Sequence, residues 1–474
     1  MDPKREGEAP PPSDKKRPDA PPTSRLGRLA RLSALAPRAL PIATHAMKKA
    51  MGFGPRPEDA ARERAELRIT AKKTAAAMLK TLGEMKGLPL KLGQMASYID
   101  GLAPPGYEEK FQEVLKSLQA KAPPLSRAAA RKVVTEELGP PEEVFAAWEE
   151  DPFAAASIGQ VHRATTHDGH RVAVKVQYPG IDKAIVNDLK SLSLLESMIA
   201  PVGRRYHTKE TLDEIKSVFL AELDYRMEAD ATDLFRHIHA EDPCIVIPRV
   251  HHSLSSRRVL TTDLMQGQDY RTFCDQAPDE EKRLAGDTIW RFMMRALWRH
   301  GALYADPHPG NYRFLGGGRV AFLDFGCHKL LSPALLEGEK RYVIAAMDGD
   351  WDAFYKGCVD FLGFDPTDEE GFRLYTEYTK FLIKPIVVDA PHKHTKEGAR
   401  EAVAFLVRGT KKLVLRPDAE FPTLPKPIDM PTEHTFMNRL QWGLASVLAG
   451  LGAEANYYRM TESWIRGPYV SPPR

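Results

Sequence analysis

Cysteine, net charge and long apolar runs are all scarce in this chain. Its four cysteines form no CxxC pair and no metal-ligand spacing, which argues against a disulfide framework or a zinc site and favours free thiols in a reducing compartment. A formal net charge of +3 is too small for 474 residues to indicate a nucleic-acid partner. No apolar run reaches the roughly 18 residues that cross a bilayer, so we expect 440–452 to be a buried helix.

The N-terminal part of the chain has a composition of its own. Residues 1–24 combine proline with charged residues and too few apolar ones to offset the entropy of ordering, so we expect disorder there. The next segment, 25–57, begins with leucines and arginines that each recur every three residues. These residues are Leu26, Leu29 and Leu32, with Arg25, Arg28 and Arg31. Such a basic amphipathic segment can lie on an anionic membrane surface; the alternatives are a helix packed on the protein body and a disordered arm.

Residues 58–145 have the composition of a helical unit that precedes the chemistry-bearing motifs. Its last helix is expected over 126–138, where a serine can serve as the N-cap and a Gly-Pro-Pro run follows. The unit also carries the pattern Lys-x-Gly-Gln, formed by Lys91 to Gln94. Four residues alone predict little, so this pattern gains meaning only from the motifs that follow it.

The most informative pattern lies near residue 310. Asp306 precedes Asn311 by five residues, and Asp324 opens an Asp-Phe-Gly sequence beyond a predicted strand, turn and strand over 312–323. Kinase-type sites use this spacing to direct oxygen ligands at nucleotide-bound Mg²⁺, which takes hard oxygen ligands from protein, phosphates and water. The alternative, a polar turn followed by an unrelated hairpin, does not account for all three polar residues.

A lysine stands inside a β-branched run over 171–176. Lys175 would be costly to bury there without an anionic partner, and a nucleotide phosphate or a helix glutamate can serve. Upstream, Ala154, Ala155, Ala156 and Ser157 occupy the position at which kinases place a glycine-rich loop over the phosphates. Alanine has little freedom at positive φ, so we expect a stiffer loop that holds the phosphates differently.

The candidate glutamate partners are Glu222 and Glu228. Because they are six residues apart on a predicted helix, they should point in different directions, and only one should face Lys175. The sequence leaves open which of the two does so. A strand and hinge are expected over 259–267, and a helix over 287–298 should lead into the catalytic loop.

Taken together over about 60–350, these motifs closely resemble the UbiB/AarF atypical kinases of bacteria, mitochondria and plastids. The motifs in order are Lys91-x-Gly-Gln94, the alanine-rich loop, Val-Ala-Val-Lys175, Glu222-x-Asp224 with Glu228, Asp306 to Asn311, and Asp324-Phe-Gly. The resemblance implies an α+β, bilobal protein-kinase-like fold with a mostly helical C-lobe. It also implies that the helical extension at 58–145 covers the active site, ahead of an N-lobe at 146–266 and a C-lobe at 267–474.

The resemblance also assigns roles by position. Lys175 would bind the α- and β-phosphates of ATP or ADP beside 154–157 and pair with Glu228, Asp306 would be the catalytic aspartate, and Asn311 and Asp324 would hold Mg²⁺. Lys91 and Gln94 would reach the site near Glu222 and Asp224. One departure is Tyr304, where a histidine that braces the loop is frequent, so the local geometry there is in question. No Ala-Pro-Glu element follows the Asp-Phe-Gly sequence, in agreement with absent peptide docking.

Such a protein is expected to be an ATP-dependent atypical kinase or ATPase that supports quinone or isoprenoid-lipid metabolism and does not act as an ordinary protein kinase. The rival interpretations are a nucleotide-binding pseudokinase scaffold and a phosphotransferase acting on choline or aminoglycosides. A lipid or quinone precursor, an anionic membrane surface and lipid-biosynthesis proteins are the expected partners. We expect a cytoplasmic protein, peripheral on the inner face of the membrane, with the mitochondrion or plastid as the alternative.

Overall fold

The structure is a computed structural model that describes residues 19–20, 23–24, 27, 126–156, 158–190, 216–217, 219–402 and 434–472. The chain divides into two compact units, which are described separately. Unit 1 comprises Met1–Ser97, Glu109–Leu192 and Ser253–Thr261, and unit 2 comprises Tyr98–Glu108, Ser193–His252 and Thr262–Arg474. Lys91, Gln94, Ser157 and all of the 25–57 segment except Gly27 lie outside the described residues, so the expectations for them stay predictions.

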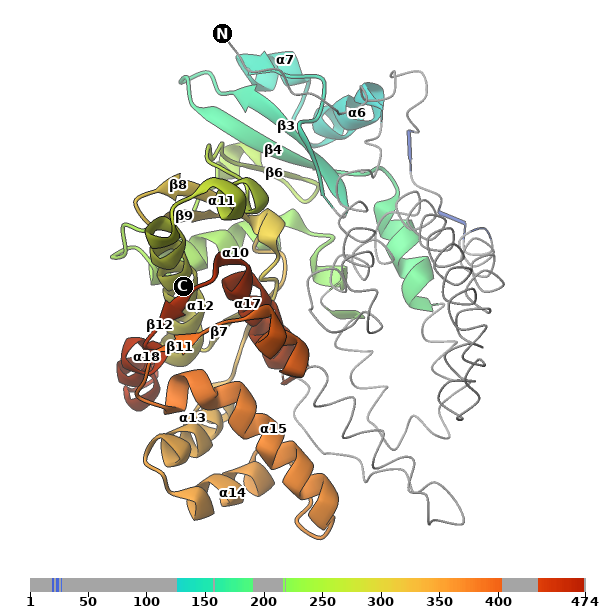
Figure 1. The fold of residues 1–474 in the computed structure, drawn as a ribbon. Coiled ribbons are helices and arrows are strands. Elements are labelled where there is room, and N and C mark those ends of the chain that lie inside the picture. The colour runs from blue at the N-terminus through green and yellow to red at the C-terminus, as the bar shows by residue number, and fades with distance from the viewer. Residues whose placement is uncertain are drawn as a thin grey trace, which may run out of the picture. The chain divides into compact units, whose positions relative to one another are not determined.

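Unit 1 is built on a five-stranded sheet with the order β1-β3-β4-β6, in which β2 also pairs with β3 (Figure 1). The strands are β1 (Ala147–Trp148), β2 (Ala154–Ala155), β3 (Gly159–Thr165), β4 (Arg171–Gln177) and β6 (Val259–Asp263). Helices α6 (Arg127–Glu137) and α7 (Pro141–Val144) accompany them, and residues 181–190 are also helical. As predicted, the Ser126 side chain caps α6 by accepting a hydrogen bond from the Ala129 amide.

One face of β4 makes the core of unit 1. Val172, Val174 and Val176 are fully buried at 0% exposure because alternate residues of a strand point to the same face. They cluster with Val133 and Val134 of α6, so this helix belongs to the core of the sheet. The sequence had placed 126–138 in the preceding helical extension, and the structure adds that the apolar stripe of this helix packs against β4.

The end of the N-terminal segment makes contacts within unit 1. The side chain of Asp19 accepts a hydrogen bond from the Ser126 hydroxyl, and the Thr23 carbonyl accepts one from Asn187 Nδ2 at 2.8 Å. Ser24 then accepts a hydrogen bond from the amide of Gly27, which is helical. The expectation of disorder over 1–24 otherwise falls on residues that are not described.

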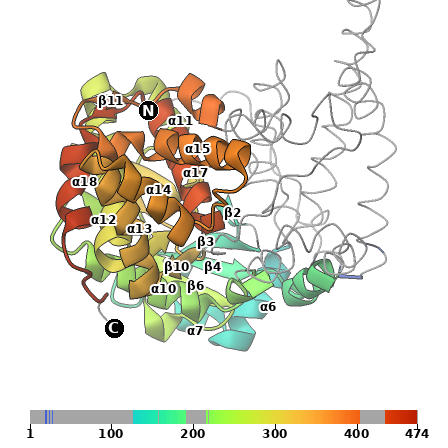
Figure 2. The same ribbon diagram turned by 90° about the horizontal axis from the view of Figure 1, so that it is seen from below.

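Unit 2 is mostly helical. Its described helices include α10 (Tyr225–Ile238), α11 (Tyr270–Gln276), α12 (Asp279–His300), α13 (Pro333–Met347), α14 (Trp351–Asp360), α15 (Glu369–Val387), α17 (His434–Leu451) and α18 (Tyr457–Arg466). The short 3-10 helix η3 (His252–Leu254) runs across the boundary between the units, and η4 (Pro309–Asn311) also belongs to unit 2. Its small sheets are β5-β9-β8, from β5 (Ile245–Val246), β8 (Tyr312–Gly316) and β9 (Arg319–Phe322), then β7 (Ala302–Tyr304) with β10 (His328–Leu330), and β11 (His392–Lys393) with β12 (Glu454–Ala455). Helices α13, α14 and α15 pack on one another (Figures 1 and 2).

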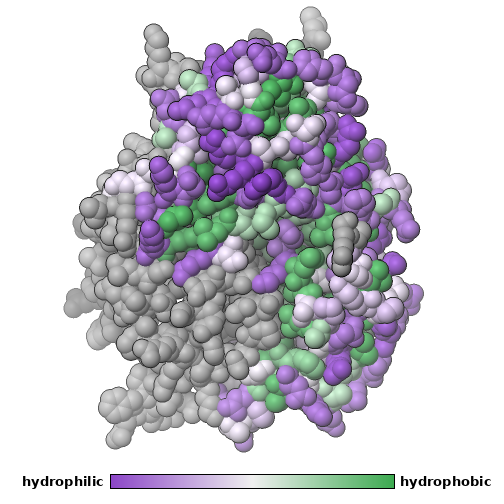
Figure 3. Space-filling view, turned by 180° about the vertical axis from the view of Figure 1, so that it is seen from behind, coloured by the Kyte–Doolittle hydropathy of each residue, from purple (hydrophilic) through white to green (hydrophobic). Residues whose placement is uncertain are grey.

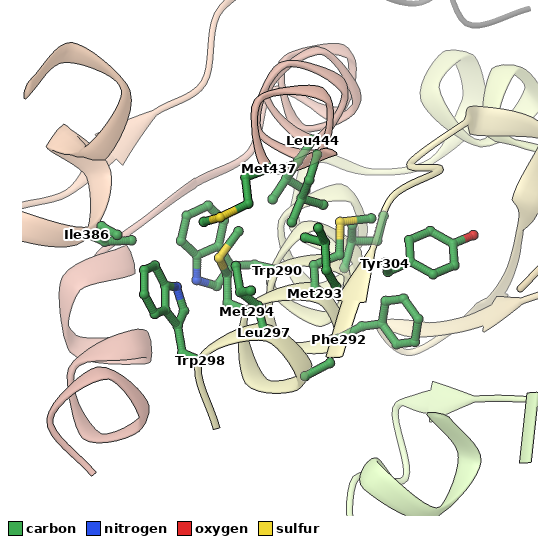
Figure 4. Close-up of a cluster of buried hydrophobic side chains, with 14 of the residues drawn as sticks. Trp290, Phe292, Met293, Met294, Leu297, Trp298, Tyr304, Ile386, Met437 and Leu444 are labelled. Atoms are coloured by element: carbon green, nitrogen blue, oxygen red, sulfur yellow. The ribbon is translucent and has the colours of Figure 1, made fainter. Parts of the chain in front are cut away.

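Helix α12 is the centre of unit 2. It contains the predicted 287–298 helix and extends it in both directions, from an acidic first turn to Gly301, whose φ of 63° ends the helix in the left-handed conformation. Figure 4 shows its Trp290, Met294 and Trp298 side chains beside Met437 of α17. Helix α17 covers the predicted buried helix at 440–452 almost completely, and its inward residues are buried, which confirms that expectation.

The described residues 216–217 and 219–252, which the sequence had assigned to the N-lobe, group with unit 2. The reason is packing, since Phe235 of α10 lies 5.6 Å from Phe292 of α12, measured between ring centroids. None of the described helices combines the length and apolar character needed to cross a membrane. On the face in Figure 3, hydrophobic residues form separate groups among hydrophilic ones.

Candidate active site

The alanine-rich segment forms a β-hairpin. Ala154 and Ala155 make up β2 and pair with Val161 and Gln160 of β3, and the Ala156 amide donates to the Gly159 carbonyl at 2.8 Å. The prediction that all three alanines form a loop is therefore wrong for the first two. Their extended backbone is fixed by pairing with β3.

Lys175 lies inside β4, as the sequence predicted. Its partner across the strands is Val161, and because Val161 also pairs with Ala154, the three side chains share one face of the sheet. Val174 and Val176 point to the other face, into the core. Lys175 is half-buried, so the lysine and the first alanine of the hairpin lie on the same side of unit 1.

Two polar residues of β3, Gln160 and His162, support the β2–β3 hairpin. His162 is 0% exposed, its ring stacks on Trp148 with centroids 4.6 Å apart, and its Nδ1 lies 3.0 Å from the Glu149 carbonyl. Burial lowers the pKa of His162 to about 4, so the ring is neutral near pH 7. Since a carbonyl only accepts, Nδ1 carries the proton and Nε2 accepts from Gln160 Nε2 at 3.1 Å. Sequence reasoning missed this support, although two polar residues alternating on a strand face were its signal.

In unit 2, Glu222 and Glu228 are not on the same helix, contrary to the prediction. Helix α10 begins at Tyr225, and Asp224 is its N-cap, accepting a hydrogen bond from the Arg226 amide. Glu222 lies in the turn before that cap. An aspartate at an N-cap satisfies an amide that the helix leaves without an intrahelical partner, which ends the helix there and leaves Glu222 outside it.

Both glutamates nevertheless approach the glycine of the Asp-Phe-Gly sequence. They are 6% and 5% exposed. A Cβ placed on Gly326 would lie 3.5 Å from Glu228 Oε2 and 3.7 Å from Glu222 Cγ. The expectation that the two glutamates point in different directions is therefore wrong, because both approach Gly326. Asp224 instead accepts a hydrogen bond from Arg226 Nη2 at 2.6 Å.

The catalytic loop begins directly after β7. Asp306 is 9% exposed, and Asn311 follows it on η4. Asn311 Nδ2 donates to the Asp306 carbonyl at 3.0 Å and lies 3.3 Å from Asp306 Oδ2. The loop is further closed by His308, whose Nδ1 accepts from the Gly310 amide at 2.9 Å. The structure thus brings together the first two of the three polar residues found by spacing.

The third residue, Asp324, is placed by the hairpin of β8 and β9. These strands confirm the predicted strand, turn and strand. The Leu323 amide donates to the Asn311 carbonyl at 3.0 Å, and Asp324 Oδ1 accepts from the Gly326 amide at 3.0 Å. Hydrogen bonds of the Asn311 side chain thus join Asp306 to Asn311, and a backbone hydrogen bond joins Asn311 to the residue before Asp324, all within unit 2.

Tyr304 joins these segments and was not among the predicted site residues. Its side chain is 0% exposed, and its hydroxyl donates to the Asp324 carbonyl at 2.9 Å and accepts from Asn311 Nδ2 at 3.4 Å. Burial raises its pKa well above the usual value, so the hydroxyl keeps its proton. The departure from histidine at this position therefore preserves a brace between the two loops.

Aromatic packing connects α10 to the same loops. Phe235 lies two helical turns after Glu228 on the same face of α10. Its ring centroid is 5.3 Å from that of Phe325 and 5.9 Å from that of Tyr304. Figure 4 shows Tyr304 near Phe292 of α12, and their centroids are 5.1 Å apart. The Asp-Phe-Gly sequence, α10 and the start of the catalytic loop therefore share one buried aromatic cluster.

The oxygen atoms fit a magnesium ion that is shared with phosphates. Because Nδ2 of Asn311 is engaged by Asp306 and Tyr304, its Oδ1 is the atom left for a metal. Asp324 offers a carboxylate beside it. No group of three or more histidine, cysteine, aspartate or glutamate side chains within the described part of the chain is arranged to hold a metal ion. Asn311 and Asp324 are the residues that would hold Mg²⁺ together with phosphates and water.

Comparisons with known proteins identify the family of this chain. The family described as ABC1 atypical kinase-like domain matches residues 117–357. The mitochondrial atypical kinase COQ8B of Rattus norvegicus is 31% identical over 413 residues, covering 86% of this chain and 76% of the rat protein. The chloroplastic protein ACTIVITY OF BC1 COMPLEX KINASE 8 of Arabidopsis thaliana is 31% identical over 290 residues, covering 59% of this chain and 37% of the plant protein.

Among solved structures, Rv3197 of Mycobacterium tuberculosis, determined in complex with erythromycin, superposes with a TM-score of 0.57 at 26% identity. The match covers 86% of this chain and 100% of the mycobacterial one. The kinase-like α+β fold expected from the sequence is confirmed. The chain belongs to the ABC1 atypical kinase-like family, which is the UbiB/AarF family.

Proposed function

We propose that this protein binds Mg²⁺ and an adenine nucleotide, hydrolyses ATP slowly, and supports quinone or isoprenoid-lipid metabolism without acting as an ordinary protein kinase. The observation that carries the proposal is the arrangement of Asp306, Asn311 and Asp324, which Tyr304 joins. A bound Mg²⁺ ion would neutralise phosphate charge. The protein's own contribution is to aim Asn311 Oδ1 and the Asp324 carboxylate and to hold Asp306 as the acceptor of a proton from the attacking hydroxyl or water.

Unit 1 contributes phosphate binding in this proposal. Lys175 supplies a charge that stays within a rigid strand, and the hairpin of β2 and β3 offers backbone amides near its turn. Ala154 shares the sheet face of Lys175, which supports a role for both at the phosphates. Glu228 is proposed as the counter-charge of the lysine, and Lys91 and Gln94 as residues that limit access by peptides.

The pathway is proposed from the family. One relative is named as a COQ8 atypical kinase of mitochondria and another as a chloroplastic protein, which supports a quinone-linked role and an organellar location. A lipid or quinone precursor, an anionic membrane surface and lipid-biosynthesis proteins are the proposed partners. Of the two locations expected from the sequence, the mitochondrion or plastid agrees with the relatives' names, and the cytoplasm stays a prediction.

Phosphate release from ATP by the full chain, measured with and without Mg²⁺ and anionic lipid vesicles, tests the biochemical part. We expect slow, Mg²⁺-dependent release that Asp306→Asn abolishes. Choline and aminoglycosides should leave the rate unchanged, and acceleration by either would favour a phosphotransferase. A wild-type protein that binds nucleotide but releases no phosphate under any of these conditions would be a pseudokinase scaffold. Quinone profiling of a strain that lacks the gene, complemented with wild type or Asp306→Asn, tests the pathway.

A further inference from the structure

We propose that Tyr304 is a positioning residue that sets the orientation of the Asn311 side-chain amide and thereby the affinity for Mg²⁺. The proposal rests on the proposed function, because it concerns how this chain prepares its metal-binding oxygen atoms. It is carried by the position of one hydroxyl group between the two segments that supply them.

The Tyr304 hydroxyl has one proton, and that proton is directed at the Asp324 carbonyl, 2.9 Å away. A carbonyl oxygen can only accept, so the hydroxyl must be the donor in this contact. The lone pairs of its oxygen are then left for Asn311, whose Nδ2 is 3.4 Å away. One oxygen atom therefore acts as a donor toward one metal-binding residue and as an acceptor toward the other.

This arrangement distinguishes the two ends of the Asn311 amide. Nδ2 has three acceptors around it, the Tyr304 hydroxyl, the Asp306 carbonyl and Asp306 Oδ2. Turning the amide over would bring Oδ1 against these oxygen atoms, so Oδ1 is directed to the opposite side. Since Mg²⁺ binds oxygen and not an amide nitrogen, the orientation decides whether Asn311 can be a ligand at all.

The same hydroxyl holds the backbone of Asp324. The peptide that begins the Asp-Phe-Gly sequence has its carbonyl fixed from one side by Tyr304, and the Asp324 carboxylate is fixed by the Gly326 amide at 3.0 Å. Partners that orient the ligands of a metal usually change its affinity by about 10- to 100-fold when they are removed. A phenylalanine at 304 would keep the ring packed against Phe292 and Phe325 and would remove only this hydroxyl.

The chain offers a matched control. Tyr457 is also 0% exposed and lies in the same hydrophobic core of unit 2, but its hydroxyl has no hydrogen-bond partner among the described residues. Tyr304→Phe and Tyr457→Phe therefore make the same chemical change in the same core. Only the first removes a contact with the proposed metal-binding residues.

The experiment titrates Mg²⁺ into the full chain with a fluorescent ADP analogue and records the Mg²⁺ concentration that gives half-maximal binding. Tyr304→Phe should raise this concentration about 10-fold, with metal-free nucleotide affinity unchanged. Tyr457→Phe should leave both quantities within twofold of wild type. In an Asn311→Ala background, the effect of Tyr304→Phe should fall to less than half on a logarithmic scale, because paired effects are not additive.

The outcomes separate the two proposals. If wild type binds the nucleotide without any dependence on Mg²⁺, the proposed function fails and this inference fails with it. If wild type depends on Mg²⁺ and Tyr304→Phe matches Tyr457→Phe, only the role of Tyr304 is wrong. If Tyr304→Phe folds poorly, the Asn311→Ala and Asn311→Asp variants decide the question. If both reach half-maximal nucleotide binding at the same Mg²⁺ concentration as wild type, the orientation of the Asn311 amide is irrelevant to Mg²⁺ affinity.

Discussion

The β2–β3 hairpin of unit 1, proposed to bind phosphates, and the loop of unit 2 from Asp306 to Asn311, proposed to be catalytic, are held in different ways. The hairpin is fixed by strand pairing, with Ala154 and Ala155 in register with β3. His162 supports it from the sheet face opposite Lys175. The catalytic loop has little strand pairing and is held by side chains, chiefly Asn311 and Tyr304. The hairpin should therefore tolerate changes of side chain better than the loop, where the side chains that hold the loop also orient or supply the proposed metal-binding atoms.

The largest effect is expected at the loop. Asp306→Asn should lower the rate of ATP hydrolysis at least about 100-fold, because the amide cannot take the proton that the carboxylate accepts. Nucleotide affinity should change less than threefold, since the proposed metal-binding residues are retained. Single-turnover hydrolysis and equilibrium binding measure the two quantities. Loss of both together would show that Asp306 organises the loop and has no separate catalytic role.

The second effect concerns the proposed ion pair between Lys175 and Glu228. Lys175→Met and Glu228→Gln should each weaken ATP binding about 10-fold, and the double variant should weaken it by less than the product. A coupling free energy of about 1 kcal/mol or more is expected for interacting groups. Additive effects would reject the pairing of these two residues and would leave Glu222, which also approaches Gly326, as the candidate.

The third effect is on the stability of the hairpin support and depends on pH. The pKa of His162 is about 4 in the folded state, below its ordinary value, so the unfolded chain binds this proton at a higher pH. The free energy of unfolding should fall as the pH is lowered from about 6.5 to 4, with a contribution from His162 of about 3 kcal/mol at the lower end.

Urea unfolding of wild type and His162→Gln over this pH range measures that contribution. Buried His239 and His394 have pKa values lowered to about 3, so wild type loses stability from several groups and only the difference between the two proteins reports on His162. The variant should lose less stability than wild type as the pH falls. Parallel curves would mean that the His162 ring does not titrate as its burial requires.

The smallest effect is expected at the turn of the hairpin. Ala156→Gly widens the allowed backbone at a residue whose amide donates to Gly159, and it should change the ratio of ATP to ADP affinity by about two- to fivefold. It should also allow some autophosphorylation. Competition binding with both nucleotides and incorporation of labelled phosphate test this, and wild-type values for each would leave the alanine as a packing residue only.

Local patterns in the sequence were enough to predict some features of the candidate site. The grouping of Asp306, Asn311 and Asp324 and the strand around Lys175 were predictable, because ligand chemistry and strand periodicity are local. The paired strand at Ala154 and Ala155 was not predictable, since alanine has no strong strand preference and the hydrogen bonds come from β3. The role of Tyr304 depends on a carbonyl twenty residues away, which spacing alone does not reveal.

Glu222 is an intermediate case. Asp224 is a strong N-cap residue, and the helical pattern that follows it could have shown that the helix begins at Tyr225. The approach of Glu222 and Glu228 to Gly326 is a tertiary property and needs the structure. The six-residue separation of Glu222 and Glu228 in the sequence does not determine how far either side chain lies from Gly326.

Asp324→Asn tests the central claim, that this loop binds nucleotide through Mg²⁺, most directly. The thermal transition of the full chain should be measured with ATP or ADP, with Mg²⁺ and with a chelator, for wild type and the variant. The account predicts that Mg²⁺ increases the stabilisation of wild type by nucleotide, and that Asp324→Asn removes this metal-dependent increase. Equal, Mg²⁺-dependent stabilisation of both proteins would contradict the assignment of Asp324 as a metal ligand.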